Sequence, residues 1–179
     1  MSERPENIET ERLFLLCLMP EEIESIVSGD LERLSLLTGV CFRADDPKLG
    51  VDWSWHLNAL RADCNEVAWR VRVIVERSSS TVVGSINLKG QPIDGDVEIG
   101  WGLNDDARRK GYATEASAAV IRWVGQQAGV SSISATVPDD NYPSQRVAAR
   151  LGLVRTSQTR RGLPLWQRTV ERVSRSGET

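Results

Sequence analysis

The chain of 179 residues has no long hydrophobic run, little cysteine and a single histidine. Its longest apolar stretch, Leu13–Met19, is far shorter than the roughly 18–20 residues that cross a bilayer, so we expect no membrane partner. Three cysteines without paired spacing argue against a disulfide framework or a zinc knuckle and favour a reducing, cytoplasmic location. The lone histidine, His56, argues against a histidine-based metal site, and we expect no metal.

Positive charge is not in excess either. Lys and Arg number 22 against 25 Asp and Glu, which gives a net charge of −3 at pH 7. A general nucleic-acid binder would show an excess of positive charge, so we expect no direct nucleic-acid partner. The length and the 40% apolar content fit one domain over residues 1–179, with its core at about 8–171 and a disordered tail at 174–179.

Two hydrophobic periodicities alternate along the chain. Alternating β-prone residues predict strands, and apolar residues recurring every three or four positions predict helices. The expected strands cover 13–18, 67–76, 81–88, 97–103, 130–137, 153–158 and 165–171. The expected helices start at Pro20, continue in broken form through 28–65, and then cover 111–128 and 143–151. This order predicts an α/β fold with one mixed, mostly antiparallel sheet of about seven strands flanked by helices.

Three consecutive cations, Arg108-Arg109-Lys110, stand where the expected helix at 111 begins. A helix N-terminus carries partial positive charge and unpaired N–H groups, so each cation there costs about 0.3–1 kcal/mol. A bound anion would offset this cost, and Gly111 would let the backbone approach a phosphate closely. The alternative is a solvated basic turn balanced by Asp105 and Asp106. The P-loop pattern and the third glycine of a dinucleotide fingerprint are both missing.

The segment Arg108-Arg109-Lys110-Gly111-Tyr112-Ala113 fits the (Q/R)-x-x-G-x-(G/A) signature of the GNAT superfamily of acyl-CoA-dependent N-acyltransferases, which the chain resembles. Further matching segments are Glu9-Thr10-Glu11-Arg12-Leu13, Val97-Glu98-Ile99-Gly100-Trp101, Thr114-Glu115-Ala116, Asn141-x-x-Ser144-x-x-Val147 and Arg150-Leu151-Gly152-Leu153. Together they look like the RimJ/RimL-type branch, the ribosomal-protein N-terminal acetyltransferases and their relatives. The resemblance runs over about residues 8–171.

The resemblance implies a GNAT fold in which the central strands at 97–103 and 130–137 splay apart. The pantetheine arm of acetyl-CoA, the co-substrate, would enter this gap and pair with exposed strand backbone. The pyrophosphate would lie on the N–H groups at the start of the following helix. The implied cofactor-binding residues are Trp101, Gly102, Leu103, Arg108, Arg109, Lys110, Gly111, Tyr112, Ala113, Thr114, Asn141 and Ser144.

The resemblance also implies catalytic residues. Glu98 matches a strand glutamate that serves as the base in several GNAT enzymes, and the alternative is a solvent-facing or salt-bridged glutamate. The family tyrosine seven residues after Asn141 is replaced by Ala148, which puts a tyrosine acid in doubt. Ser144 would then donate a hydrogen bond to the leaving thiolate while Asn141 holds the pantetheine amides. Alternatively, both residues only cap a helix.

The sequence defines the residues that would bind the acceptor amine less clearly than those that would bind acetyl-CoA. Trp53 and Trp55, with Glu98, are the candidate substrate-binding residues, and the alternative is that both tryptophans are core. His56 is a further candidate base. We expect an N-acetyltransferase in which a protein or peptide N-terminal α-amine attacks acetyl-CoA directly in a ternary complex, as a monomer or homodimer. The alternatives are acetylation of a small amine, such as a polyamine, aminoglycoside or amino acid, and a non-catalytic acyl-CoA-binding module.

Overall fold

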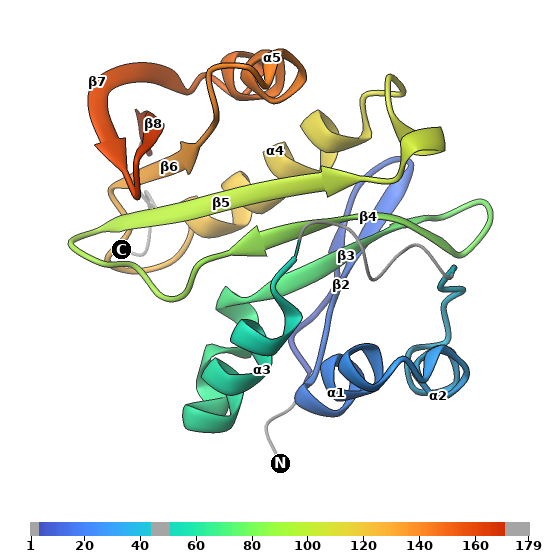
Figure 1. The fold of residues 1–179 in the computed structure, drawn as a ribbon. Coiled ribbons are helices and arrows are strands. Elements are labelled where there is room, and N and C mark those ends of the chain that lie inside the picture. Colours follow the sequence, from blue (N-terminus) through green and yellow to red (C-terminus); the bar gives the residue numbers. More distant parts are fainter. Residues whose placement is uncertain (1–3, 44–50, 171–179) are drawn as a thin grey trace, which may run out of the picture.

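One mixed sheet organises the fold (Figure 1). The computed structural model describes residues 4–43 and 51–170, so the tail expected at 174–179 lies outside the described residues. Eight strands within these ranges follow the order β1-β2-β3-β4-β5-β6-β8-β7. They are β1 (Ile8–Glu9), β2 (Leu13–Cys17), β3 (Val71–Glu76), β4 (Thr81–Leu88), β5 (Asp96–Leu103), β6 (Ser132–Thr136), β7 (Val154–Arg160) and β8 (Leu163–Thr169).

The predicted mixed, mostly antiparallel sheet is confirmed. Neighbouring strands pair antiparallel except β5 and β6, which pair in parallel. The count exceeds the expected seven because the two-residue β1 adds an edge strand, with Ile8 opposite Leu15. Two residues are too few for a periodic pattern to reveal in the sequence.

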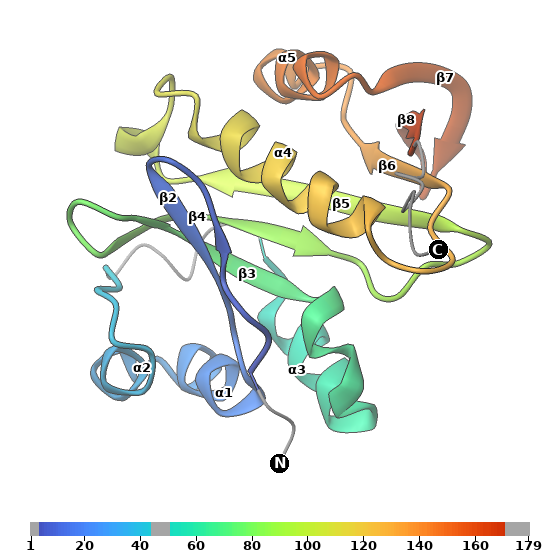
Figure 2. The same ribbon diagram turned by 180° about the vertical axis from the view of Figure 1, so that it is seen from behind.

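Helices cover both faces of the sheet (Figure 2). They are α1 (Pro20–Ser28), α2 (Leu31–Thr38), α3 (Trp53–Ala62), α4 (Tyr112–Gly125) and α5 (Tyr142–Arg150), with short 3₁₀ helices at Cys64–Trp69 and Asp105–Ala107. Helix α4 crosses one face, α1 to α3 lie on the other, and α5 lies beside β6 and β7 (Figures 1 and 2). The broken helical segment expected at 28–65 thus supplies α2 and α3.

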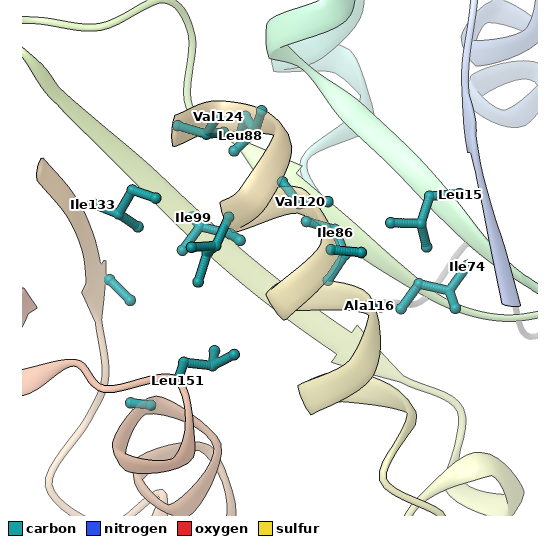
Figure 3. Packing of buried hydrophobic residues seen from close by; sticks show 14 of the residues in the cluster. Leu15, Ile74, Ile86, Leu88, Ile99, Ala116, Val120, Val124, Ile133 and Leu151 are labelled. Atoms are coloured by element: carbon teal, nitrogen blue, oxygen red, sulfur yellow. The ribbon is translucent and has the colours of Figure 1, made fainter. Parts of the chain in front are cut away.

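Two hydrophobic clusters hold these layers together. The larger one lies between α4 and the sheet (Figure 3), and its members include Leu15, Ile74, Ile86, Leu88, Ile99, Ala116, Val120, Val124, Ile133 and Leu151. The second packs under α1 to α3, and its members include Leu16, Leu18, Ile23, Leu57, Leu60, Val73, Val75 and Val82. Successive strand residues point to opposite faces, so Leu15 and Leu16 fall in different clusters.

Two element boundaries differ from the prediction by more than two residues. The strand expected from residue 67 begins only at Val71, because a 3₁₀ helix capped by Asp63, which accepts from Asn65 N at 2.9 Å, precedes it. Val67 is buried from within that helix, so apolar alternation continues across the boundary. The helix expected to reach residue 128 ends at Gly125 and is followed by a turn, with Gly129 left-handed at φ +81°.

Candidate functional site

The loop between β5 and α4 contains two left-handed residues, Arg109 at φ +64° and Gly111 at φ +83°. Gly111 is the N-cap of α4, and in the first backbone hydrogen bond of the helix Glu115 N donates to Gly111 O at 3.0 Å. The backbone N–H groups of residues 112–114 lie in the first turn of the helix, and Gly111 has no side chain that could cap them. An outward row of amides at a helix N-terminus favours an anion such as a phosphate.

Arg12 holds this loop from the start of β2. Its guanidinium donates from Nη1 to Lys110 O at 3.0 Å and from Nε to Glu115 Oε2 at 2.8 Å. The Arg12 backbone N–H and the Thr10 hydroxyl donate to Glu115 Oε1, at 3.2 and 2.6 Å. Burial would raise the pKa of Glu115, but these hydrogen bonds outweigh it and lower that pKa. These hydrogen bonds fix both ends of the turn. The sequence prediction did not include the role of Arg12 and Thr10 in holding it.

The predicted cofactor-binding residues of the loop fall into two groups. Tyr112 and Ala113 bury their side chains in the core, so only their backbone can contact a ligand. Arg108 is largely exposed and forms an ion pair with Asp105 at 2.9 Å. The predicted residues that stay exposed at the turn are Arg108, Arg109, Lys110 and Gly111, with Thr114 half-buried. The loop therefore combines backbone amides with exposed positive charge.

Strands β5 and β6 part after a short parallel contact. Within the described residues, Asp96–Glu98 of β5 pair with Ser132–Ser134 of β6, whereas β4 pairs with β5 over Ile99–Leu103. The second half of β5 therefore has β4 on one edge and no paired strand on the other. This is the splay that the family resemblance implied, and it leads directly to the loop before α4 (Figure 1).

The backbone of β5 shows which residues serve the unpaired edge. Glu98 O accepts from Lys89 N at 3.0 Å, on the β4 side. Backbone groups of an antiparallel strand alternate in direction, so those of Trp101 and Leu103 point to the opposite edge. Gly102 shares the direction of Glu98 and faces β4. Of the three residues predicted to pair with pantetheine, Trp101 and Leu103 offer backbone groups to the unpaired edge, whereas the backbone of Gly102 faces β4.

Helix α5 begins after β6, on the far side of this parting (Figure 1). Asn141 is its N-cap, and its Oδ1 accepts from Ser144 N at 3.1 Å. The capping role that the sequence left open is therefore present, and it leaves the Asn141 amide N–H groups and the Ser144 hydroxyl outside the cap. Ala148 is fully buried in the core, so no acid stands at that position. Tyr142, the first residue of the helix, is 64% exposed.

The face of β4, β5 and β6 that points away from α4 is polar. Residues on this face alternate with core residues that pack against α4. They are Ser85 and Asn87 on β4, Glu98, Gly100 and Gly102 on β5, and Ser134 on β6. A Cβ added to Gly100 would meet only Asn87 Cβ, at 4.0 Å, so the space above this part of β5 is open.

Glu98 is buried on this face and is ion-paired. Its Oε2 lies 3.1 Å from Arg160 Nη1, Arg161 Nη2 contacts Oε1, and the Thr136 hydroxyl donates to Oε1 at 3.3 Å. Arg160 ends β7 and Arg161 follows it in the turn to β8, both more than 60 residues along the chain from Glu98. The salt-bridged alternative is the arrangement observed, and the base role of Glu98 stays a prediction.

Asp96 joins several strands where β5 and β6 are still paired, before they separate. It accepts from the hydroxyls of Ser132 and Ser134 at 2.7 and 2.6 Å, from Arg160 at 3.0 Å and from Gln167 at 3.2 Å. Burial raises the pKa of Asp96, but these donors outweigh it and the net shift is downward. Four strands are therefore joined beside Glu98 by contacts that no local sequence pattern indicated.

Among the described residues, buried polar atoms near this face without a hydrogen-bond partner include Ser85 Oγ and, beside Trp55, the Nε and Nη1 groups of Arg70. Burial, with Lys89 and Arg70 nearby, lowers the pKa of His56 from 6.5 to about 4, and a side-chain hydrogen bond with Asn87 offsets only part of that shift. The sequence prediction treated Ser85 and Asn87 as strand residues only. The feature that could have identified them as part of a polar face is their position two residues apart in a mostly apolar strand.

The two candidate substrate-binding tryptophans of α3 lie in different environments. Trp53 is 8% exposed and packs in the second hydrophobic cluster, so it belongs to the core. Trp55 is 41% exposed, with the Arg70 guanidinium 4.7 Å and the Lys89 ammonium 5.7 Å from its ring centre. Helical spacing explains the difference, because residues two apart face different sides of a helix. Only Trp55 lies beside the polar face.

Within residues 4–43 and 51–170, no group of three or more His, Cys, Asp or Glu side chains could hold a metal ion. None of the helices in these ranges has both the length and the hydropathy that a membrane span requires.

Curated relatives match part of the chain. It is 36% identical over 83 residues to YjdG, an uncharacterised N-acetyltransferase of Bacillus subtilis, which is 46% of this chain and 49% of that protein. A second B. subtilis protein named an uncharacterised N-acetyltransferase, YnaD, is 29% identical over 91 residues, 51% of this chain and 54% of that protein. The chain thus matches about half the length of these relatives.

Solved structures share the fold over nearly the whole chain. The ribosomal-protein-S5-alanine acetyltransferase from Vibrio fischeri superposes with a TM-score of 0.68 at 15% identity, covering 93% of this chain and 98% of that one. RimL, a ribosomal L7/L12 α-N-protein acetyltransferase solved with coenzyme A, gives 0.63 at 14% identity, covering 92% and 98%. The profile of the acetyltransferase (GNAT) domain matches residues 28–154, well over half of the chain. The chain therefore belongs to the GNAT acetyltransferase domain family.

Proposed function

We propose that this protein transfers an acetyl group from acetyl-CoA to the N-terminal α-amine of a protein or peptide. The observation that carries the proposal is the unpaired edge of β5 leading into the amide row at Gly111. An extended amide chain ending in a pyrophosphate matches that surface, because strand backbone binds amides and a helix N-terminus binds phosphate.

In the proposed complex, the N–H groups of residues 109–114 bind the pyrophosphate and the exposed cations add electrostatic attraction. The backbone of Trp101 and Leu103 binds the pantetheine amides from one side, and the Asn141 amide binds them from the other. The acyl end then lies between β5 and the start of α5. Trp101, Leu103 and Asn141 position the thioester beside Ser144.

The chemistry requires one proton to leave the amine. The amine nitrogen forms a bond to the thioester carbonyl carbon, the C–S bond breaks with its electron pair going to sulfur, and one proton leaves nitrogen. The products are an amide and the thiol of coenzyme A. The Ser144 hydroxyl donates a hydrogen bond to the sulfur as charge develops on it, since position 148 offers no acid.

An α-amine is the acceptor that this site can use most easily. With a pKa of about 7.8, an α-amine is roughly 14% neutral at pH 7, a deficit of about 1 kcal/mol, whereas a lysine amine near 10.4 starts about 4.6 kcal/mol down. The names of the S5-alanine enzyme and of RimL also describe acetylation of ribosomal proteins, and the second specifies the α-amine. Both points support a protein N-terminus as acceptor.

Glu98 serves in this proposal as the anchor of Arg160 and Arg161, because its carboxylate is engaged by both. Glu98→Gln should therefore lower kcat by a similar factor, about tenfold, at pH 6.5 and at pH 9. Initial rates of thiol release at the two pH values check this. A loss confined to pH 6.5, where the α-amine is mostly protonated, would instead assign Glu98 the base role that the sequence predicts.

The proposed function is tested by thiol release from acetyl-CoA over a panel of acceptors. The panel contains short peptides that begin with serine or alanine, the same peptides with blocked N-termini, and polyamine, aminoglycoside and amino-acid probes. Release with the free N-terminal peptides alone is the expected result. Release with a small amine only would assign a small-molecule enzyme, and acetyl-CoA binding without release would assign a binding module.

A further inference from the structure

The turn between β7 and β8 projects beside the part of β5 that has no paired strand. Leu165 on β8 stands opposite Thr136, the last residue of β6. One step further on, Val137 N donates to Pro164 O at 3.1 Å. The turn residues that precede Pro164 therefore lie past the end of β6. Since β5 and β6 are parallel, this places the turn along the direction in which the two strands separate.

The turn carries an arginine in an unfavourable backbone conformation. Arg160 and Leu163 are paired at the ends of the two strands. The two residues between them, Arg161 and Gly162, are both left-handed, at φ +52° and +76°. A two-residue hairpin turn of this kind favours asparagine at its first position and glycine at its second. An arginine at the first position thus indicates a role for its side chain.

The Arg161 side chain is held by Glu98 and keeps most of its donors open. Its Nη2 contacts Glu98 Oε1, and no other ion pair holds it within the described residues. The side chain is 60% exposed, whereas that of Glu98 is 7% exposed. A guanidinium has five N–H donors, so a buried carboxylate fixes this one while its remaining N–H groups are open to a ligand.

Lys89 approaches the same carboxylate from β4. Its backbone N–H donates to Glu98 O at 3.0 Å, so the two residues stand opposite each other across β4 and β5. The preceding Leu88 packs in the cluster under α4, and Lys89 therefore points to the polar face. There its ammonium lies 5.7 Å from the Trp55 ring centre. No carboxylate of the described residues forms an ion pair with it.

Between these two cations the face of β5 is open. Gly100 follows Glu98 by two residues on this face, roughly 7 Å along the strand. A Cβ there would meet only Asn87 Cβ. The opening above Gly100 thus has no side chain of its own, and Arg161 and Lys89 lie beside it. It adjoins the unpaired edge of β5, where the proposed function places the thioester.

The charges around Glu98 do not balance. Asp96 and Glu98 supply two negative charges against the three positive charges of Arg160, Arg161 and Lys89. Further along this face, Arg70 is neutralised by its ion pair with Glu66. The Asp52 carboxylate caps α3 by accepting from Trp55 N at 2.9 Å. One more negative charge beside Arg161 and Lys89 would balance the group around Glu98.

We propose that Arg161 and Lys89 bind a carboxylate of the acceptor, so that the preferred substrate is a peptide with an acidic residue at its second or third position. This inference rests on the proposed function and names the class of peptide that it uses. Hydrogen bonds from a guanidinium to a carboxylate are among the strongest in proteins. The same two cations repel polyamines and aminoglycosides, which carry several positive charges.

Three acceptor peptides test the charge preference. They share a serine N-terminus and differ only at the second and third residues, which are both aspartate, both asparagine or both lysine. The kcat/KM of the wild type, measured as thiol release from acetyl-CoA, should be about tenfold or more higher for the aspartate peptide than for the asparagine peptide, and lowest for the lysine peptide. Equal values, or a preference for lysine, would overturn the proposal.

Arg161→Asn and Lys89→Gln assign the preference to these residues. Asparagine suits the left-handed turn, and Glu98 keeps Arg160 and Thr136 as partners, so the melting temperature should stay close to that of the wild type. In each variant the ratio of kcat/KM between the aspartate and asparagine peptides should fall about threefold or more, and in the double variant it should approach one. An unchanged ratio in both single variants would contradict the assignment.

Arg61→Gln is the matched control. Arg61, near the end of α3, is 56% exposed and is likewise paired with one carboxylate, that of Glu24 at 2.6 Å. Its substitution should leave the ratio between the two peptides at the wild-type value. If the wild type releases no thiol with any peptide, the proposed function fails and the carboxylate site with it. Release at equal rates from the three peptides overturns the carboxylate site alone.

Discussion

His56 lies buried on α3 with the ring of Trp55 edge-on, their centres 4.9 Å apart. The helical pattern places His56 near the buried stripe of α3, but nothing in the sequence places Asn87 and Lys89 beside it, because they follow more than 30 residues later. A lone histidine among tryptophans therefore could not be distinguished from an ordinary core residue by sequence. The partners from β4 make the difference.

The low pKa of His56 predicts a specific pH dependence of stability. Folded His56 titrates at about 4 and the unfolded chain at the ordinary 6.5, so between these values the unfolded state binds the extra proton. The free energy of unfolding should therefore fall by about 2 kcal/mol from pH 7 to pH 5 on account of this group alone.

His56→Leu should remove that part of the pH dependence, because leucine does not titrate and has a similar size. Urea unfolding of both proteins at pH 7 and pH 5 measures it. The drop in the free energy of unfolding should be smaller in the variant by about 2 kcal/mol. An equal drop in the two proteins would show that the imidazole is solvated enough to keep its ordinary pKa.

At the level of elements, the start of α4 depends on β2. Arg12 bonds Lys110 O before the turn and the Glu115 carboxylate after it, which fixes the direction of the N–H groups between them. The basic signature of the loop was visible in the sequence, whereas this clamp joins residues 103 apart. Sequence reasoning therefore placed the phosphate-binding segment but not the contacts that hold it in shape.

Arg12→Ala should weaken acetyl-CoA binding about tenfold, roughly 1.4 kcal/mol, because the freed loop must be ordered again on binding. Calorimetry with acetyl-CoA measures this, and a melting curve confirms that the variant is folded. Arg77→Ala is a suitable control, since Arg77 is also half-exposed and ion-paired, with Glu9 at 2.5 Å. Equal affinities of the Arg12 and Arg77 variants would exclude a positioning role for Arg12.

The secondary structure was likewise predicted well where local patterns determine it and less well where contacts distant in sequence do. The strand expected at 81–88 and the helix expected from 111 match β4 and α4 closely, because periodicity and end signals agree there. Residues 67–69 form a 3₁₀ turn instead of a strand, since burial of Val67 preserves the apolar pattern. Glu98 was identified from its strand, but its arginines come from a distant hairpin.

On the scale of the whole molecule, the sheet is two half-sheets that meet at the first residues of β5. Three residue pairs join β5 to β6, and Asp96 reinforces that junction through β6, β7 and β8. Beyond the junction β5 stays paired with β4, and the two half-sheets diverge toward the loop before α4 (Figure 1). Binding of acetyl-CoA at this opening is the central claim of the account.

Calorimetric titration of acetyl-CoA into the wild type, Gly111→Asp and Gly129→Asp tests that claim most directly. Both glycines are left-handed, at φ +83° and +81°, so both substitutions carry similar backbone strain, but only Gly111 begins the amide row of α4. The account predicts binding to the wild type and to Gly129→Asp with similar affinity, and a loss of about tenfold or more in Gly111→Asp, where a carboxylate enters the phosphate site. No heat with the folded wild type, or equal affinity in all three proteins, would contradict it.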